Sequence, residues 1–136
     1  MTSILDQIRR DYEARFGQPR DELIEAGRVR DFLLAMDEPA TFSSDEQVPA
    51  LFLLTLARTR RPQPAKGTSV NAGDEYEFFA PVYVGDRITV SRRVIGVEEK
   101  QGKANLMWLI RVEANYHNQR GEIVARAKSC LLRWGL

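Results

Sequence analysis

The sequence has 136 residues, 43% of them hydrophobic, and this size and composition fit one domain with a single core. Twenty basic and 19 acidic residues nearly cancel, so charge gives no reason to expect nucleic acid or a membrane surface as partner. The single cysteine cannot form a disulfide within the chain, and one histidine without a cysteine cluster excludes the common zinc sites, so we expect no metal. The first residues include Asp6 and Asp11 and lack the apolar stretch of a signal peptide, so we expect a cytoplasmic protein.

An amphipathic helix is predicted over residues 1–17. Ile4, Ile8, Tyr12 and Phe16 recur every four residues and therefore share one face of a helix. This apolar stripe could pack on the domain itself or on a partner subunit. The sequence leaves both possibilities open.

Two short elements are predicted to follow the first helix. Residues 21–26 are suited to a short strand, and residues 28–36 to a second helix with its apolar residues on one face. Pro39 prevents the continuation of this helix, because proline lacks the amide hydrogen that the helix interior needs.

Residues 47–60, QVPALFLLTLARTR, are predicted to form a buried central helix. Between Val48 and Ala57 only Pro49 and Thr55 interrupt an apolar run that covers all sides of a helix, and such a helix is buried. Pro49 suits the first helical turn. The segment is shorter than the roughly 20 residues that a membrane-spanning helix needs.

From residue 74 onward, apolar and polar residues alternate with a period of two, which is typical of strands. The residues on the predicted inner face of the last two strands are Leu106, Trp108, Ile110, Val112, Ala114, Tyr116, Ile123, Ala125, Ala127, Ser129 and Leu131. Long antiparallel strands that follow one apolar helix must cover it to bury their own apolar face. We therefore predict an α+β fold in which a curled antiparallel sheet over residues 74–134 wraps around the central helix.

Three segments of the sequence resemble those of a known family. They are Phe79-Ala80-Pro81 with Val84-Gly85-Asp86, the turn from Asn118 to Glu122, and the entry from Val48 to Phe52 into the predicted helix. Together with the helix-then-sheet order, they resemble the hot-dog fold and, within it, the MaoC-like (R)-specific enoyl-thioester hydratases and dehydratases. The resemblance is to the N-terminal-type domain of the family, which looks non-catalytic. It extends over roughly residues 22–134.

This resemblance implies a single hot-dog domain over residues 1–136 that takes part in fatty acid metabolism. Family members add water to, or remove it from, enoyl thioesters of coenzyme A or an acyl carrier protein. The acyl thioester is then the substrate, no cofactor is needed, and the chain forms a homo- or hetero-oligomer, such as a dimer, with another hot-dog subunit.

The resemblance also identifies what the chain lacks. In the family's catalytic domain, a loop before the central helix reads Asp-x-Asn-Pro-x-His, and such a carboxylate and imidazole activate water and move its proton. Here Pro39 is present, but Met36, Glu38 and Thr41 stand at the Asp, Asn and His positions. The resemblance therefore implies a subunit without its own catalytic histidine, completed by a catalytic hot-dog partner.

Candidate site residues follow from the same resemblance. Asp37 and His117 are weak candidates for acid and base, and a solvated surface side chain is the simpler interpretation of each. Basic residues within 58–66 are candidates to meet cofactor phosphates. The candidates for substrate binding are Pro49, Ala50, Phe52, Tyr76, Phe78 and Phe79, with core packing as the alternative for the aromatic residues.

Two further functions stay open at this stage. A hot-dog acyl-CoA thioesterase would need a carboxylate on the central helix or its loop, and only Asp45 or Glu46 could serve. A homo-oligomeric protein that binds acyl thioesters without chemistry is the other possibility. A homodimer that hydrates substrate alone through Asp37 and His117 is also conceivable.

Overall fold

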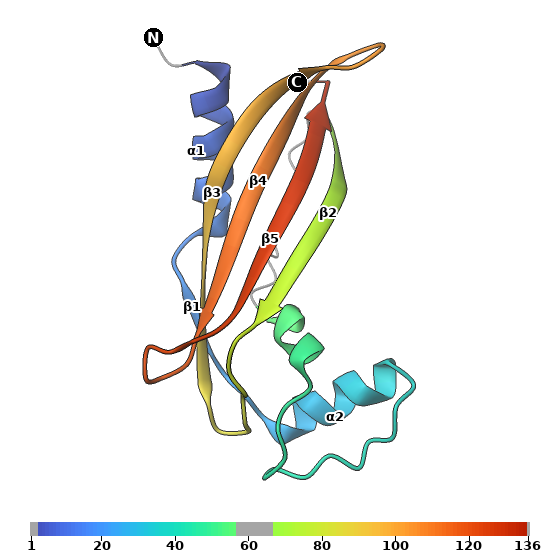
Figure 1. The fold of residues 1–136 in the computed structure, drawn as a ribbon, viewed down its shortest axis with the longest axis vertical. Helices are drawn as coiled ribbons and strands as arrows, with labels where there is room; N and C mark the ends of the chain where they lie inside the picture. The colour runs from blue at the N-terminus through green and yellow to red at the C-terminus, as the bar shows by residue number, and fades with distance from the viewer. Residues whose placement is uncertain (1–2, 57–66, 136) are drawn as a thin grey trace.

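The structure is a computed structural model that describes residues 3–56 and 67–135. Its elements in chain order are α1 (Ile4–Phe16), β1 (Arg20–Leu23), α2 (Ala26–Ala35), the 3₁₀ helix η1 (Ala50–Thr55), β2 (Thr68–Phe78), β3 (Arg87–Gln101), β4 (Leu106–His117) and β5 (Ile123–Trp134). The strands form one antiparallel sheet in the order β1-β3-β4-β5-β2 (Figure 1). Within the described residues, no helix is long and apolar enough to cross a membrane.

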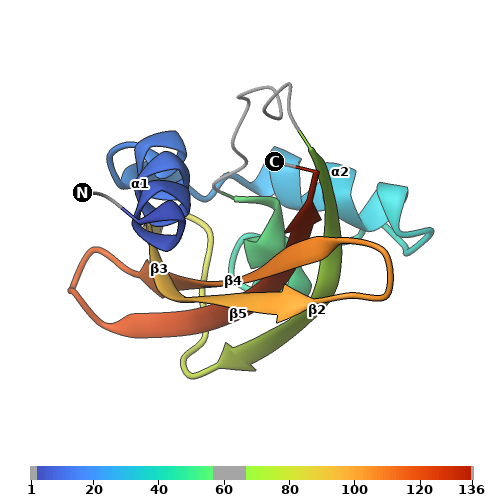
Figure 2. The ribbon, with the colours of Figure 1, turned by 90° about the horizontal axis from the view of Figure 1, so that it is seen from above.

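The sheet curls, and α1, η1 and α2 all lie on its concave side (Figure 2). The predicted α+β class with a curled antiparallel sheet is therefore confirmed. The sheet is larger than residues 74–134, because β2 begins at Thr68 and β1 is added at the other edge. Buried side chains form two clusters, one under α2 and η1 and the other under α1.

Helix α1 packs on the sheet of its own chain. Its amide at Asp6 donates to the Ser3 side-chain oxygen at 3.1 Å, a hydrogen bond that caps the first turn. Ile8 and Tyr12 are buried against β3, β4 and β5. Arg9 Nη1 donates to the carbonyl of Val94 at 2.9 Å. The apolar stripe of this helix therefore contacts the domain, which resolves the alternative that the sequence left open.

The prediction of a central helix over residues 47–60 needs correction. Gln47 forms an isolated β-bridge with Tyr83, and the Val48 amide donates to the carbonyl of Val82 at 2.7 Å, so the chain is extended there. Only Ala50–Thr55 is helical, as a 3₁₀ helix, and Leu56 is again extended. Residues 57–60 lie outside the described residues.

The physical reason is that burial of apolar residues does not select the α-helix over other compact conformations. Phe52, Leu53 and Leu56 are buried as the apolar run predicts, but Leu51 is half exposed. Pro49 has ψ 132°, which is not helical, and the strand-like bridge before it satisfies the backbone without a helix. The Thr55 hydroxyl donates to the carbonyl of Phe52 at 2.7 Å, a local bond of the kind that competes with helix continuation.

The two edges of the sheet differ in length and exposure. One edge is β1, which has four residues and pairs only with residues 87–90 of β3, and the other is β2, which has eleven residues, all of them exposed. The exposed residues of β2 include the large hydrophobic side chains of Val70, Tyr76 and Phe78. A long exposed edge strand offers unpaired backbone groups to another strand, so β2 is an open edge among the described strands.

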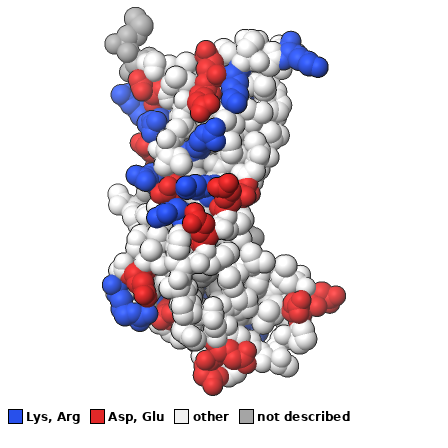
Figure 3. Space-filling view, viewed as in Figure 1, with Lys and Arg blue, Asp and Glu red and all other residues white. Residues whose placement is uncertain are grey.

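Charged side chains of both signs lie across the outer, convex face of the sheet (Figure 3). Arg93 pairs with Glu113 at 3.1 Å, and Arg111 pairs with Glu98 at 3.5 Å. Glu113 also accepts a hydrogen bond from Asn115 at 2.9 Å. The convex face is therefore polar, and the helices cover the opposite, apolar face.

Candidate functional site

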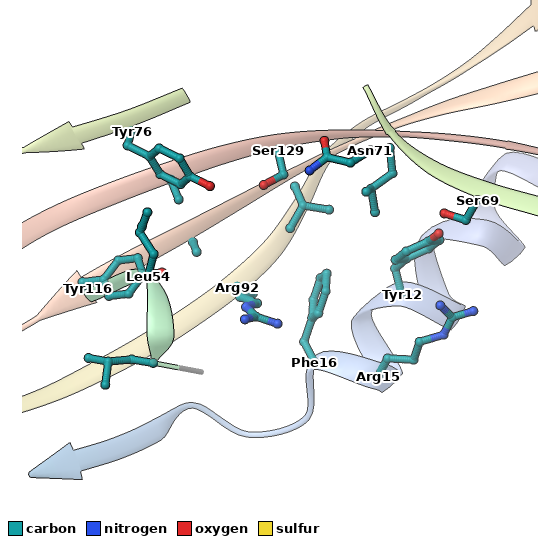
Figure 4. A pocket seen from close by; sticks show the side chains of 15 residues that line it. Tyr12, Arg15, Phe16, Leu54, Ser69, Asn71, Tyr76, Arg92, Tyr116 and Ser129 are labelled. Carbon is teal, nitrogen blue, oxygen red and sulfur yellow. The ribbon is translucent and has the colours of Figure 1, made fainter. Parts of the chain in front are cut away.

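A cavity of about 320 Å³ lies between the concave face of the sheet, α1 and η1 (Figure 4). Its lining residues are Tyr12, Arg15, Phe16, Leu54, Leu56, Ser69, Asn71, Tyr76, Arg92, Val112, Ala114, Tyr116, Ala127, Ser129 and Leu131. Cavities that bind small ligands are usually of about this volume or larger. The site is therefore large enough for a small organic ligand or part of a longer one.

Two of the described residues that line this cavity are cations. Arg92 projects from the middle of β3, and its guanidinium lies 6.0 Å from the centre of the Phe16 ring. Arg15 comes from the last turn of α1 and lies 4.6 Å from the centre of the Tyr12 ring. Burial is the main cause that lowers the pKa of Arg92, but a guanidinium stays protonated in proteins at neutral pH. The cavity is therefore positively charged.

Hydroxyl and amide groups line the rest of its polar surface. Burial raises the pKa of the Tyr116 phenol, against the opposing charge of Arg92, and burial also raises the pKa of Tyr76. Both phenols are protonated at neutral pH; the Tyr116 phenol can act as a donor, and the Tyr76 phenol is hydrogen-bonded with Asp74. Figure 4 shows the Tyr76 and Ser129 hydroxyls pointing toward one another from neighbouring strands.

The described residues that line the cavity include no histidine, aspartate, glutamate or cysteine. General acid–base catalysis near neutral pH needs a group whose pKa lies near the operating pH. Phenols with raised pKa values and guanidinium groups do not meet this requirement. Among the described residues, no cluster of three or more His, Cys, Asp or Glu side chains could hold a metal ion.

The two candidate acid–base residues are not brought together. Asp37 is exposed just after α2, with φ 58°, and its amide donates to the carbonyl of Leu34 at 3.1 Å. His117 ends β4, opposite Thr89 of β3. The end of α2 and the turn between β4 and β5 lie on opposite sides of the molecule (Figures 1 and 2). Neither residue lines the cavity.

The predicted aromatic residues divide between three environments. Tyr76 lines the cavity. Phe52 is buried in the core, where its ring meets that of Phe32 edge-on with the centres 5.7 Å apart. Phe78 and Phe79 are exposed at the end of β2 and do not line the cavity.

The start of η1 lies outside the cavity lining. Pro49 precedes η1 and Ala50 begins it, and only Leu54 and Leu56 of this segment reach the cavity. The candidate phosphate-binding residues within 58–66 lie outside the described residues.

The sequence interpretation missed Arg92, although its position carried a signal. Ile88, Val90 and Val94 mark the inner face of β3 by their period of two, and Arg92 falls in the same register. A cation within an otherwise apolar inner face needs a polar neighbour or a ligand. Ser129 carries the same signal in β5, since it falls among alanine and leucine residues.

Comparison with known proteins identifies the family. The family described as FAS1-like, dehydratase domain region, matches residues 13–127. The chain belongs to this family. No curated protein matches the sequence. The resemblance to MaoC-like dehydratases that was stated from the sequence is therefore confirmed for this FAS1-like dehydratase region.

Solved structures show that this dehydratase-region chain has the hot-dog fold. The Mycobacterium tuberculosis HadBC (3R-hydroxyacyl-ACP dehydratase) complex is 21% identical, with TM-score 0.66 over 85% of this chain and 91% of that chain. The ChsH1-ChsH2 complex of M. tuberculosis is 13% identical, with TM-score 0.71 over 95% and 92%. The MaoC-like dehydratase of Rhodospirillum rubrum is 16% identical, with TM-score 0.66 over 87% and 89%. At these identities the likeness establishes the fold.

Proposed function

We propose that this chain is a subunit of an enoyl-thioester hydratase or 3-hydroxyacyl-thioester dehydratase that shapes the acyl site without supplying its acid or base. One observation carries the proposal. The concave face of a dehydratase-family domain holds a cavity whose described lining has polar donors and apolar walls but no histidine or carboxylate. Such a cavity binds and orients an acyl group, while the proton transfers need another chain.

The chemistry requires that second chain. Hydration of an enoyl thioester needs a base to take a proton from water, and a donor to stabilise the negative charge that develops on the thioester oxygen. Asp37 is exposed and does not line the cavity, and the loop around it lacks the histidine of catalytic relatives. A catalytic hot-dog partner supplies both the carboxylate and the imidazole in this proposal.

In this proposal the partner pairs along the open edge of β2. Its eleven residues are exposed, and Ser69, Asn71 and Tyr76 belong both to this edge and to the cavity lining. A strand paired along β2 would therefore lie beside the cavity and could carry catalytic groups toward it. Two of the similar structures, HadBC and ChsH1-ChsH2, are complexes.

The test is hydratase activity on a medium-chain trans-2-enoyl-CoA, followed by the loss of the conjugated-thioester absorbance. The purified chain is assayed alone and after co-expression with a hot-dog protein encoded beside it. Activity in the pair, which a His→Ala change in the partner abolishes, would support the proposal. Full activity of the chain alone would contradict it.

Neither alternative function is favoured by a specific feature. Asp45 accepts a hydrogen bond from the Ser43 hydroxyl, which is the main cause that lowers the pKa of Asp45, and Glu46 accepts one from the Ser43 amide at 3.2 Å. Both carboxylates serve this exposed turn and lie outside the cavity lining, so a thioesterase has no candidate nucleophile or base there. Thioester binding without turnover, unchanged by a partner, would instead identify a binding protein.

A further inference from the structure

We propose that the cavity selects acyl groups that end in a carboxylate, so that the substrate is the thioester of a dicarboxylic acid. This inference rests on the proposed function, because it assigns the substrate class of the same site. The inference also goes beyond the proposed function, since nothing in enoyl-thioester hydration requires a charged acyl end.

The positive charge of the cavity is the first argument. Arg92 of β3 and Arg15 of α1 both line it. Arg133 of β5, only 4% exposed, lies close by with its guanidinium 5.6 Å from the centre of the Tyr12 ring. Three guanidinium groups on the concave side raise the electrostatic potential where water is partly excluded, and an anion is attracted more strongly there than in bulk water.

Two carboxylates act on phenols of the cavity from outside its described lining. Asp74 of β2 accepts a hydrogen bond from the Asn71 side chain at 2.7 Å, and its charge and its hydrogen bond with Tyr76 contribute to the raised pKa of Tyr76. Glu22 of β1 pairs with Arg28 at 3.7 Å and contributes to the raised pKa of Tyr116. Neither carboxylate is among the described lining residues, which include two arginines and no acidic side chain.

Neutral donors complete the site for a carboxylate. Figure 4 shows the Arg92 guanidinium between Tyr116 and Phe16, with the Tyr76 and Ser129 hydroxyls on the neighbouring wall. A planar guanidinium matches the two oxygens of a carboxylate, and such charge-assisted pairs are stronger than neutral hydrogen bonds. The raised pKa of Tyr116 keeps its phenol protonated as a donor, whereas the Tyr76 phenol is also hydrogen-bonded with Asp74.

Apolar side chains form the remaining walls and suit a hydrocarbon chain. They are Leu54, Leu56, Val112, Ala114, Ala127 and Leu131, from η1, β4 and β5. A free phosphate or another small inorganic anion would leave these walls in contact with water. A ligand with an apolar body and one carboxylate satisfies both kinds of surface.

The test measures binding of three probes by isothermal titration calorimetry, to this chain alone and to its complex with the co-expressed hot-dog partner: adipoyl-CoA, hexanoyl-CoA and free adipate. The first two differ only in the terminal carboxylate. We expect adipoyl-CoA to bind at least about tenfold more tightly, a difference of about 1.4 kcal/mol. Arg92→Gln should abolish this preference, and Arg92→Lys, which keeps the charge, should retain part of it.

Matched controls separate the site from general effects of charge and folding. Arg111→Gln removes an arginine from the convex face, where it pairs with Glu98, and should leave the preference unchanged. Arg15→Gln changes the second lining cation on another element. If circular dichroism shows that Arg92→Gln is unfolded, Arg15→Gln is used in its place to test the carboxylate preference.

The outcomes distinguish this inference from the proposed function. Equal binding of adipoyl-CoA and hexanoyl-CoA would overturn the carboxylate preference and leave the thioester function standing. Binding of free adipate that depends on Arg92, with no binding of either thioester, would support the carboxylate site and overturn the thioester function. Absence of binding by all three probes would overturn both.

Discussion

The Arg133 guanidinium of β5 lies 5.6 Å from the centre of the Tyr12 ring of α1, and this contact joins the first helix to the last strand. Arg15 lies 4.6 Å from the same ring, so both arginines contact Tyr12. Tyr12 is buried and also lines the cavity. The N-terminal helix is therefore part of the core and part of the candidate site.

Substitution Tyr12→Ala should destabilise the protein by about 3 to 5 kcal/mol, the usual cost of deleting a large buried aromatic side chain. The expected measurement is the free energy of unfolding from urea titration. Tyr83→Ala removes an exposed tyrosine and should change this free energy by less than about 1 kcal/mol. Equal effects of the two substitutions would show that α1 does not pack on the sheet in solution.

The Glu113 carboxylate on the convex face should contribute to stability above acidic pH. Its hydrogen bonds from Asn115 and then Arg93 lower its pKa below the ordinary value of 4.5. A lowered folded-state pKa gives stability that is present above about pH 4.5 and is lost as the pH falls through the folded-state value. Glu113→Gln should therefore reduce the free energy of unfolding at pH 7 and flatten its decline in acid.

The control for this pH dependence is Glu98→Gln. Glu98 pairs with Arg111 at 3.5 Å in an exposed position, where ion pairs contribute little. The free energy of unfolding of Glu98→Gln between pH 7 and pH 3 should match that of the unchanged protein. An unaltered acid decline in Glu113→Gln would show that Glu113 is not the titrating group.

The open edge of β2 should be sensitive to a new charge. Val70 is exposed in β2, and Val70→Lys places a charge of the kind that blocks pairing at strand edges. We expect the complex with a co-expressed hot-dog partner to dissociate on size-exclusion chromatography. Ile95→Lys puts the same charge on an exposed site of β3, which is not hydrogen-bonded to β2, and should leave the complex intact.

Asp37 should have a structural role and no catalytic one. It adopts φ 58°, a conformation that glycine accepts without strain. Asp37→Gly should therefore keep the hydratase activity of the paired complex within about twofold and change the free energy of unfolding by about 1 kcal/mol or less. A loss of activity of more than tenfold, with the fold retained, would make Asp37 catalytic.

The strands could be predicted from the sequence because alternation of side chains is a local property. The inner faces of β4 and β5 were predicted, and Trp108, Ile110, Tyr116 and Ala125 are buried there. The central helix could not be predicted correctly. Its apolar run is buried, but the β-bridge between Gln47 and Tyr83 holds the chain before it in an extended conformation. A pairing between residues so far apart cannot be recognised from the local sequence pattern.

The candidate site was predicted only in part for a similar reason. Tyr76 was expected at the site on the basis of a family resemblance, and the structure places it in the cavity lining. Arg15 and Arg92 are far apart in the sequence, and only the packing of α1 on β3 brings them to one cavity. The tertiary structure brings these two arginines together, and the spacing of residues in the sequence does not reveal it.

The inequality of the two sheet edges limits how many chains an assembly can contain. β2 presents eleven exposed residues, whereas on the other side β1 pairs with only four residues of β3 and Arg9 of α1 donates to the carbonyl of Val94 beyond them. If two chains pair through the β2 edge of each, that edge is used up in both, and the assembly closes by two-fold symmetry. Pairing through β2 would therefore give a closed two-chain particle and no polymer.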